Sequence, residues 1–237
     1  MAAEHHSILY EPVNKAWHAT GLDEALGVEA VPDQVVMGCL IVVVVAAVFI
    51  PLGRRLSFDR PSKLQQMTEL FVEAFSGLIE DVIGHGAARR FMPFIGSLGV
   101  FIWLSNMSGL LFFLQPPTAN TNTTFALAIT AWSYYHLQGL KKHGFKYFKQ
   151  FLGPVPFLIP LFIPLELISH TARVLSLGLR LFGNIFGEHT ATNVFFLIPF
   201  IAPFPMMALG IFGGTLQTFV FCMLTIVYIA GAEAAEH

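Results

Sequence analysis

The chain has 237 residues, of which 55% are hydrophobic and 12% charged, and its mean hydropathy is +0.66. Soluble domains carry about 25% charged residues and about 45–50% apolar ones, so this composition predicts an integral membrane protein and argues against a soluble enzyme. The formal net charge of −2 argues against a nucleic-acid partner. Cys39 and Cys222 each lie in a long apolar run, where we expect small hydrophobic side chains rather than a disulfide.

Five stretches of the sequence are long and apolar enough to cross a bilayer, which takes about 20 residues of helix. They lie at residues 34–52, 91–114, 122–140, 154–200 and 201–232. The first follows an acidic segment and starts far from residue 1, so we interpret it as a retained helix rather than a signal peptide. The fourth is too long for one perpendicular crossing, which predicts a helix that is strongly tilted, partly outside the membrane, or broken.

Residues 62–83, between the first two spans, have a different pattern. Apolar residues recur at helical spacing from Leu64 to Val82, while glutamates and glutamines occupy the other side. This pattern predicts an amphipathic helix along the membrane interface, with a soluble hairpin helix as the alternative. No internal repeat is visible, so the expected fold is one all-α polytopic membrane domain over residues 1–237, with five spans and one interfacial helix.

Charge placement predicts the topology. Residues 1–33 carry six acidic residues and one basic residue, Lys15. Basic residues follow the first span at 54–63, enter the second at Arg89 and Arg90, and follow the third at 141–149. Because basic loops stay in the cytoplasm, the N-terminal segment 1–33 is expected outside and the C-terminus inside.

The fourth span carries an unusual number of polar and ionisable residues. At about 100° per residue, one face of the predicted helix collects seven of them: Glu166, Ser169, Arg173, Ser176, Arg180, Asn184 and Glu188. The opposite face is mostly apolar. Arg180 lies near the middle of the hydrophobic depth, about 21 Å along the helix from Glu166 and about 12 Å from Glu188. Ionisable residues at such depth are costly and usually functional, so this face is the candidate site.

Structural interpretations stand beside the functional one. Arg173 can extend its charged end to the cytoplasmic surface, and Ser169 and Ser176 can bond their own helix backbone. Arg180 and Glu188 can form a buried ion pair, although nothing in the sequence builds a cage around it. His189 falls on the opposite side from Arg180, where a packed, hydrogen-bonded side chain is the commoner outcome. No His, Cys or carboxylate spacing predicts a metal or cofactor site.

The fifth span is apolar apart from a few residues that gather on one side. Gly210, Gly214, Gln217 and Tyr228 fall within about 60° of one another. We interpret this side as a small-residue packing face that also meets the polar face of the fourth span.

The stretch SLGLRLFGN at 176–184, followed by TLQTFVFCMLTIVYIAGA at 215–232, resembles subunit a of the F-type ATP synthases. The resemblance extends over essentially the whole chain, including the acidic N-terminus and the PTAN outer loop. It implies a non-catalytic stator with two strongly tilted final helices against a ring of c subunits. The other implied partners are the peripheral-stalk b subunits and the rest of the ATP synthase. The resemblance also implies a location in a bacterial plasma membrane.

The resemblance also implies roles for single residues. Arg180 matches the family's arginine, which pairs with a deprotonated ring carboxylate and separates two aqueous half-channels, one to each side of the membrane. Asn184 and Gln217 match polar positions beside it, and Glu166, Ser169 and Ser176 match the inner half-channel. Arg173 and Tyr228 complete the set of expected proton-translocating residues.

On the outer side the sequence departs from the family pattern. Some members carry a carboxylate where this chain has His189, one position after Glu188, and a histidine where it has Gly210. The outer proton carrier is therefore Glu188 or His189, and the choice stays open. The sequence also leaves open whether the coupling ion is H⁺ or Na⁺, because the ion ligands belong to the c subunit.

Two other function classes fit less well. A secondary transporter that binds an anion at Arg180 would show inverted repeats and paired broken helices. An intramembrane enzyme would need metal-ligand spacing, or a nucleophile with a base on the same helix face. Neither pattern is present in the sequence.

Overall fold

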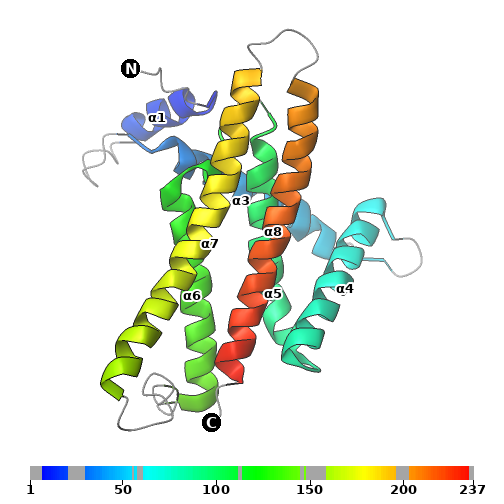
Figure 1. Cartoon of the computed structure of the whole chain (residues 1–237). Helices are drawn as coiled ribbons and strands as arrows, with labels where there is room; N and C mark the ends of the chain where they lie inside the picture. Colours follow the sequence, from blue (N-terminus) through cyan, green and yellow to red (C-terminus); the bar gives the residue numbers. More distant parts are fainter. Residues whose placement is uncertain are drawn as a thin grey trace. The chain divides into compact units, whose positions relative to one another are not determined.

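A computed structural model describes residues 7–20, 30–54, 56–57, 61–111, 114–144, 147, 159–195 and 203–234. These residues form seven α-helices and one short 3-10 helix, and the described part contains no strand, as an all-α chain should (Figure 1). They divide into two compact units. Unit 1 comprises Met1–Ser57, Val100–Thr123 and Phe182–Thr218, and unit 2 comprises Phe58–Gly99, Thr124–Leu181 and Phe219–His237.

The helices follow the predicted order with shifted ends. They are α1 (Tyr10–Ala19), α3 (Asp33–Arg54), α4 (Lys63–Ile83), α5 (Ala87–Ser108), η1 (Pro117–Ala119), α6 (Thr121–His143), α7 (Ile159–Phe195) and α8 (Pro203–Glu233). Helices α5, α6, α7 and α8 each contribute residues to both units. The predicted ends of the fourth span and the start of the fifth, at residues 154–158 and 196–202, lie outside the described residues.

Three of the described helices are long and apolar enough to cross a membrane: α3, α5 and α8. The predicted spans at 122–140 and 154–200 also form helices, α6 and α7, but α6 is rich in Thr, Tyr and His and α7 carries the polar face. Their low hydropathy follows from these residues. The 37 residues of α7 correspond to about 55 Å of helix, which exceeds the roughly 30 Å of a bilayer core.

The second predicted span ends earlier than its hydropathy suggests. Helix α5 stops at Ser108 rather than at residue 114. Beyond it, Gly109, Leu110 and Leu111 donate their backbone N–H groups to the carbonyls three residues before them, which closes tight turns instead of helix. Pro116 also packs against Gly109, where an added Cβ would lie 3.0 Å from the proline ring. Apolar composition continues here although the helix does not.

In unit 1, α1 is held to the start of α3. The Ser7 backbone N–H donates to Asp33 over 2.8 Å, and the Ser7 hydroxyl donates to the other oxygen of the same carboxylate. Asn14 accepts from the Val31 N–H over 2.7 Å. Past Ile41, the valines of α3 are largely exposed on the chain, as expected of a helix surrounded by lipid.

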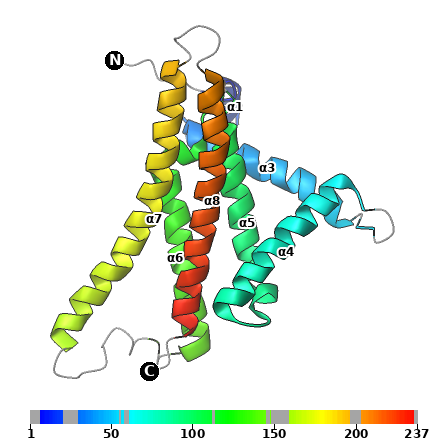
Figure 2. The ribbon, with the colours of Figure 1, turned by 45° about the vertical axis from the view of Figure 1, so that its right-hand side comes forward.

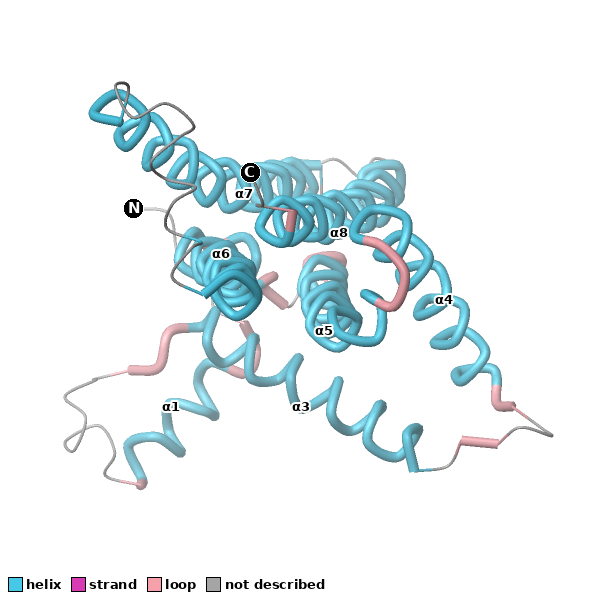
Figure 3. The backbone as a smooth tube through the Cα atoms, turned by 90° about the horizontal axis from the view of Figure 1, so that it is seen from below, coloured by secondary structure: helices cyan, strands magenta, loops and turns pink. Residues whose placement is uncertain are grey.

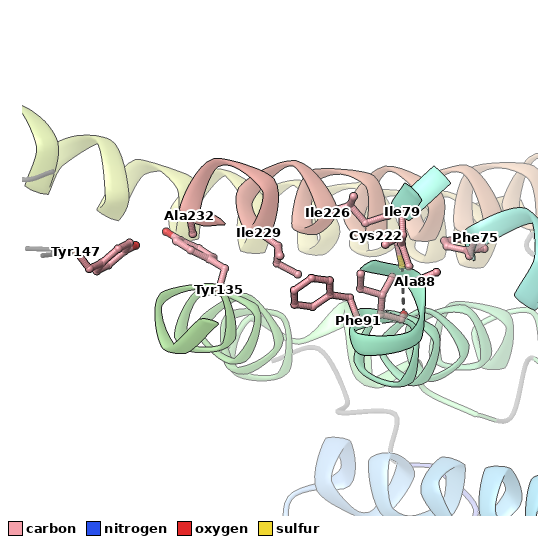
Figure 4. Packing of buried hydrophobic residues seen from close by; sticks show 11 residues of the cluster. Phe75, Ile79, Ala88, Phe91, Tyr135, Tyr147, Cys222, Ile226, Ile229 and Ala232 are labelled. Atoms are coloured by element: carbon pink, nitrogen blue, oxygen red, sulfur yellow. Dashed lines mark hydrogen bonds between the residues drawn. The ribbon is translucent and has the colours of Figure 1, made fainter. Parts of the chain in front are cut away.

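In unit 2, helices α5, α6 and α8 lie side by side, as the end-on view of Figure 3 shows. Figures 1 and 2 show α7 turning away from the end of α8 towards Ile159. One apolar cluster joins α4, α5, α6 and α8 (Figure 4). Its buried members are Phe75, Ile79, Ala88, Phe91, Ile95, Tyr135, Tyr147, Cys222, Ile226, Ile229 and Ala232.

Helix α4 is the predicted amphipathic helix. The Ser62 hydroxyl accepts from the Gln65 N–H over 3.2 Å and caps its first turn. Phe75 and Ile79 enter the cluster of unit 2, while Leu64, Met67 and Leu70 are exposed. Gly84 and Gly86 turn the chain into α5 with φ of +123° and +82°, a backbone that other residues rarely adopt.

Candidate functional site

All seven residues of the predicted polar face lie on the single unbroken helix α7. Ser176, Arg180 and Asn184 are exposed on the chain, whereas Glu166, Ser169, Arg173 and Glu188 are half-buried. The residues divide between the two units at Leu181, so each part is described separately.

Arg180 is exposed on the surface of unit 2. Within the described part of its unit it forms neither a hydrogen bond nor an ion pair. Its neighbours Leu175 and Leu179 are also exposed, at 45% and 51%. A guanidinium among exposed leucines is unfavourable in lipid and has no partner in its own unit, so this surface suits a partner that brings a negative charge.

The approach of α7 to α6 depends on Gly178, two residues before Arg180. An added Cβ at Gly178 would lie 3.1 Å from the ring of Phe125 on α6. The glycine thus lets α7 pack against α6 on one side while Arg180 faces outwards on another.

In unit 1, the carboxylate of Glu188 packs directly against the backbone of α8. An added Cβ at Gly210 would collide with Glu188 Oε1 and lie 3.0 Å from Leu110, and one at Gly213 would lie 3.1 Å from Glu188 Oε2. Asn184 Nδ2 reaches the Gly213 carbonyl at 3.5 Å. The two glycines therefore form the space that the carboxylate occupies, and a side chain at Gly210 would force the Glu188 carboxylate to move.

His189, a predicted outer residue, and Gln217, predicted beside Arg180, each have a polar atom without a hydrogen-bond partner in the described part of the chain. His189 is half-buried and Gln217 is buried, and neither His189 Nδ1 nor Gln217 Nε2 has a hydrogen-bond partner among the described residues. The same holds for Ser105 Oγ on α5. Buried polar atoms of this kind are usually satisfied by water, so unit 1 has polar positions that ordered water can occupy.

Sequence reasoning missed Asn106, which connects three segments of unit 1. Its Nδ2 donates to the Gly214 carbonyl over 3.0 Å and to Thr218 Oγ1 over 3.2 Å. Its Oδ1 accepts from the Thr118 hydroxyl over 2.8 Å. The available signal was a lone asparagine in an otherwise apolar span, which predicts an interhelical hydrogen bond.

In unit 2, Arg173 and Tyr228 of the predicted set lie together. The Arg173 guanidinium carbon lies 5.3 Å from the centre of the Tyr228 ring, a cation–π contact between α7 and α8. Arg173 therefore stacks on an aromatic ring.

Glu166, also from the predicted set, belongs to a histidine–tyrosine cluster that sequence reasoning missed. We define this cluster as Glu166, His170, Tyr135, His136 and Tyr147. His170 Nε2 lies 3.2 Å from Glu166 Oε1, and His170 Nδ1 lies 3.0 Å from the Tyr135 hydroxyl. His136 Nδ1 lies 2.8 Å from the Tyr147 hydroxyl. The sequence Tyr-Tyr-His at 134–136, inside a predicted span, was the available signal.

Tyr147 lies beyond the end of α6 and closes this cluster. Burial raises the pKa of Tyr147 to about 12, so its hydroxyl keeps its proton at neutral pH. Its ring lies over Gly139 so closely that an added Cβ there would collide with it. Gly139 is thus needed for Tyr147 to reach His136.

The chemistry available along α7 and α8 is proton transfer and ion pairing. The described residues contain no group of three or more His, Cys, Asp or Glu that could hold a metal ion. They do contain carboxylates, imidazoles and phenols within hydrogen-bond distance of one another, and α7 carries the exposed Arg180.

Comparison with known proteins gives a family. The model of the ATP synthase A chain family matches residues 35–230. The chain is 44% identical to ATP synthase subunit a 1 of Syntrophotalea carbinolica, over 84% of either chain. It is 40% identical to ATP synthase subunit a of Sulfurihydrogenibium sp., over 86% of this chain and 99% of the relative. It is 38% identical to ATP synthase subunit a of Trichlorobacter lovleyi, over 92% and 95%.

Proposed function

The chain belongs to the ATP synthase A chain family, and on this premise we propose that it is the proton-conducting stator of a rotary F-type ATP synthase. It is a non-catalytic subunit of the membrane sector, and its partners in the proposal are a ring of c subunits, the peripheral-stalk b subunits and the rest of the complex. The observation that carries the proposal is the exposed Arg180, without a partner in its unit, at the centre of the polar face of α7.

Arg180 acts on the carboxylate that each c subunit carries into the membrane. Its permanent charge favours the deprotonated carboxylate, and the ring releases its proton when it reaches the arginine. A carboxylate must take up a proton again before it turns into lipid, because a bare charge there is too costly. The fixed cation also repels a proton that would pass directly between the two half-channels.

The outer half-channel is formed by Glu188, His189, Asn184 and Gln217. Glu188 is the better acceptor of the first two, because its carboxylate lies against α8 in the space left by Gly210 and Gly213. The inner half-channel contains Ser176, Arg173, Ser169, Glu166 and Tyr228. A proton that passes both crosses the membrane potential, which supplies about 2.3 kcal/mol per charge at 100 mV.

The proposal includes the membrane arrangement expected from the sequence. Helices α6 and α7 cross together with α3, α5 and α8, giving five spans in one domain, with α4 along the cytoplasmic interface. The N-terminus lies outside and the C-terminus in the cytoplasm, in a bacterial plasma membrane. The basic residues before α5 and at the end of α6 support this orientation.

Substitution of Arg180 tests the proposal in membrane vesicles that contain the whole ATP synthase. We expect Arg180→Ala to lower ATP-driven proton pumping at least about hundredfold, since a preorganised charge is removed, and to increase passive proton leak. Arg180→Lys should also fail to pump, because a lysine can lose its proton. The amount of assembled complex is measured in parallel. Normal pumping by both variants would refute the proposal.

A further inference from the structure

The histidine–tyrosine cluster of unit 2 connects a buried imidazole to a half-exposed carboxylate. His170, Tyr135 and Tyr147 are 4%, 1% and 4% exposed, whereas the Glu166 side chain is 30% exposed. His170 is one helical turn after Glu166 on α7, at about 80° from Arg180 and therefore at the edge of the polar face. The cluster thus borders the face that the proposed function assigns to the inner half-channel.

Each ring nitrogen of His170 faces a different polar group. The neutral ring that carries its proton on Nε2 fits this arrangement, because the Tyr135 hydroxyl then donates to Nδ1, and Nε2 lies 3.2 Å from the Glu166 carboxylate. A histidine held in this way can gain a proton at one nitrogen and lose one from the other. A histidine that only filled space would not need a different polar group at each nitrogen.

We propose that His170 is a proton carrier of the inner half-channel, oriented by Tyr135 and delivering to Glu166. This inference rests on the proposed function. A proton that arrives at Nδ1 converts the ring to imidazolium, and the Nε2 proton then passes to the Glu166 carboxylate. Glu166 passes it on to water. The ring returns to its first tautomer by losing the Nδ1 proton to water and regaining an Nε2 proton from the same water, so that the net result is one proton delivered to Glu166. No bond other than N–H and O–H bonds changes.

The charged and titratable groups around His170 suit a transient proton. On its own helix, Glu166 attracts a cation and Arg173 repels one. From α6 it meets Tyr135 and His136, whose rings lie 6.2 Å and 4.7 Å from its own. The ring of Tyr228 on α8 lies 5.8 Å from that of Tyr135 in a tilted arrangement, and the Tyr147 hydroxyl lies within hydrogen-bond distance of His136. Glu166 and Arg173 therefore act on a charged ring in opposite directions.

The proposal has a consequence for the coupling ion. An imidazole carries a proton, whereas Na⁺ is a hard cation that needs several oxygen ligands and is not carried by a ring nitrogen. If His170 carries the current, the coupling ion is H⁺.

Chemical rescue by imidazole tests the proposal, in inverted vesicles that expose the cytoplasmic side of the complete ATP synthase. We expect His170→Ala to slow ATP-driven pumping about tenfold. Added imidazole, which can enter the space vacated by the ring, should restore at least about half of the rate. His170→Gln keeps a polar side chain but cannot carry a proton, and should be equally slow without rescue. Tyr135→Phe should slow pumping less, since it removes only the orienting hydroxyl.

The controls separate this inference from the proposed function. His85, an exposed histidine in the turn before α5, provides the matched control. His85→Ala should pump normally with or without imidazole. Normal pumping by His170→Gln, or a slow His170→Ala that imidazole does not restore in assembled complex, would overturn the carrier role. If the Arg180 variants fail while those of His170 pump normally, only this inference falls. If the Arg180 variants pump normally, the proposed function itself falls.

Discussion

The two parts of α7 surround their carboxylates in opposite ways. Glu188 in unit 1 packs against glycines, with a single long contact nearby from Asn184 to Gly213. Glu166 in unit 2 ends a cluster in which a histidine, two tyrosines and a second histidine contact one another. One added methyl group can displace a carboxylate that is positioned only by the space around it. A carboxylate that is held through polar contacts loses its position when one of its partners is removed. The two regions should therefore respond to different substitutions.

The largest difference is expected at Gly210. Gly210→Ala places a methyl group where the Glu188 carboxylate lies, and should lower ATP-driven pumping about tenfold or more, because a displaced proton acceptor is costly even at short distance. The rate is measured in vesicles by quenching of a pH-sensitive dye. Gly38→Ala on α3 is the matched control, because an added Cβ there meets nothing within 4 Å.

Shortening the acid should relieve the same clash. Glu188→Asp in the Gly210→Ala background withdraws the carboxylate by about one bond length, and we expect part of the lost rate to return. Unchanged pumping by Gly210→Ala alone would mean that Glu188 need not stay against α8. Loss of pumping in His189→Gln, with normal rates in Glu188→Gln, would transfer the outer role to His189.

A moderate effect on stability is expected at Asn106. Asn106→Leu keeps the volume of the side chain but leaves Thr118 and Thr218 without their shared partner. The stability of the complex should therefore fall by about 1–2 kcal/mol. Thermal dissociation of the purified complex measures this. Thr130→Val is a suitable control, because the Thr130 hydroxyl is exposed and bonds only its own helix at Ala126. Equal behaviour of the two variants would contradict a bridging role for Asn106.

The sequence predicts those structural features whose pattern of residues lies within a single helix. The uninterrupted apolar run predicts α3 to within two residues, at 34–52 against Asp33–Arg54. The sequence also predicts that the residues of the polar face share a helix, because this depends on the spacing within α7 alone. The end of α5 was missed, because hydropathy stays high through Leu110 and Leu111 where turns already close.

Contacts between helices were beyond the sequence. Periodicity identifies the face on which His170 lies, but it does not say that Tyr135 of α6 occupies the space opposite. The same is true of Asn106 and its partners, and of Gly210, whose small size is explained only by the carboxylate that lies against it. A single helix specifies which residues share a side, and the partner helix specifies what they do there.

The smallest effect is expected at the end of α8, where two exposed basic side chains meet the Glu233 carboxylate, whose side chain is 12% exposed. Glu233 lies 2.9 Å from Arg90 and 3.7 Å from Lys142, and both basic side chains are 47% exposed. Its backbone carbonyl also accepts from Lys142 Nζ and lies 3.0 Å from His143 Nε2, contacts that a glutamine at this position keeps. Glu233→Gln should therefore lower the stability of the complex by less than about 1 kcal/mol, and this loss should become smaller as salt is added.

Thermal dissociation of the complex at low and high salt measures the Glu233 effect, with Glu73→Gln on the exposed side of α4 as the control for loss of one negative charge. A loss as large as that of Asn106→Leu, or one that salt does not reduce, would mean that Glu233 is shielded from solvent in the assembled complex. In that case the end of α8 would belong with the histidine–tyrosine cluster, as a region held by specific polar contacts rather than by screened surface charge.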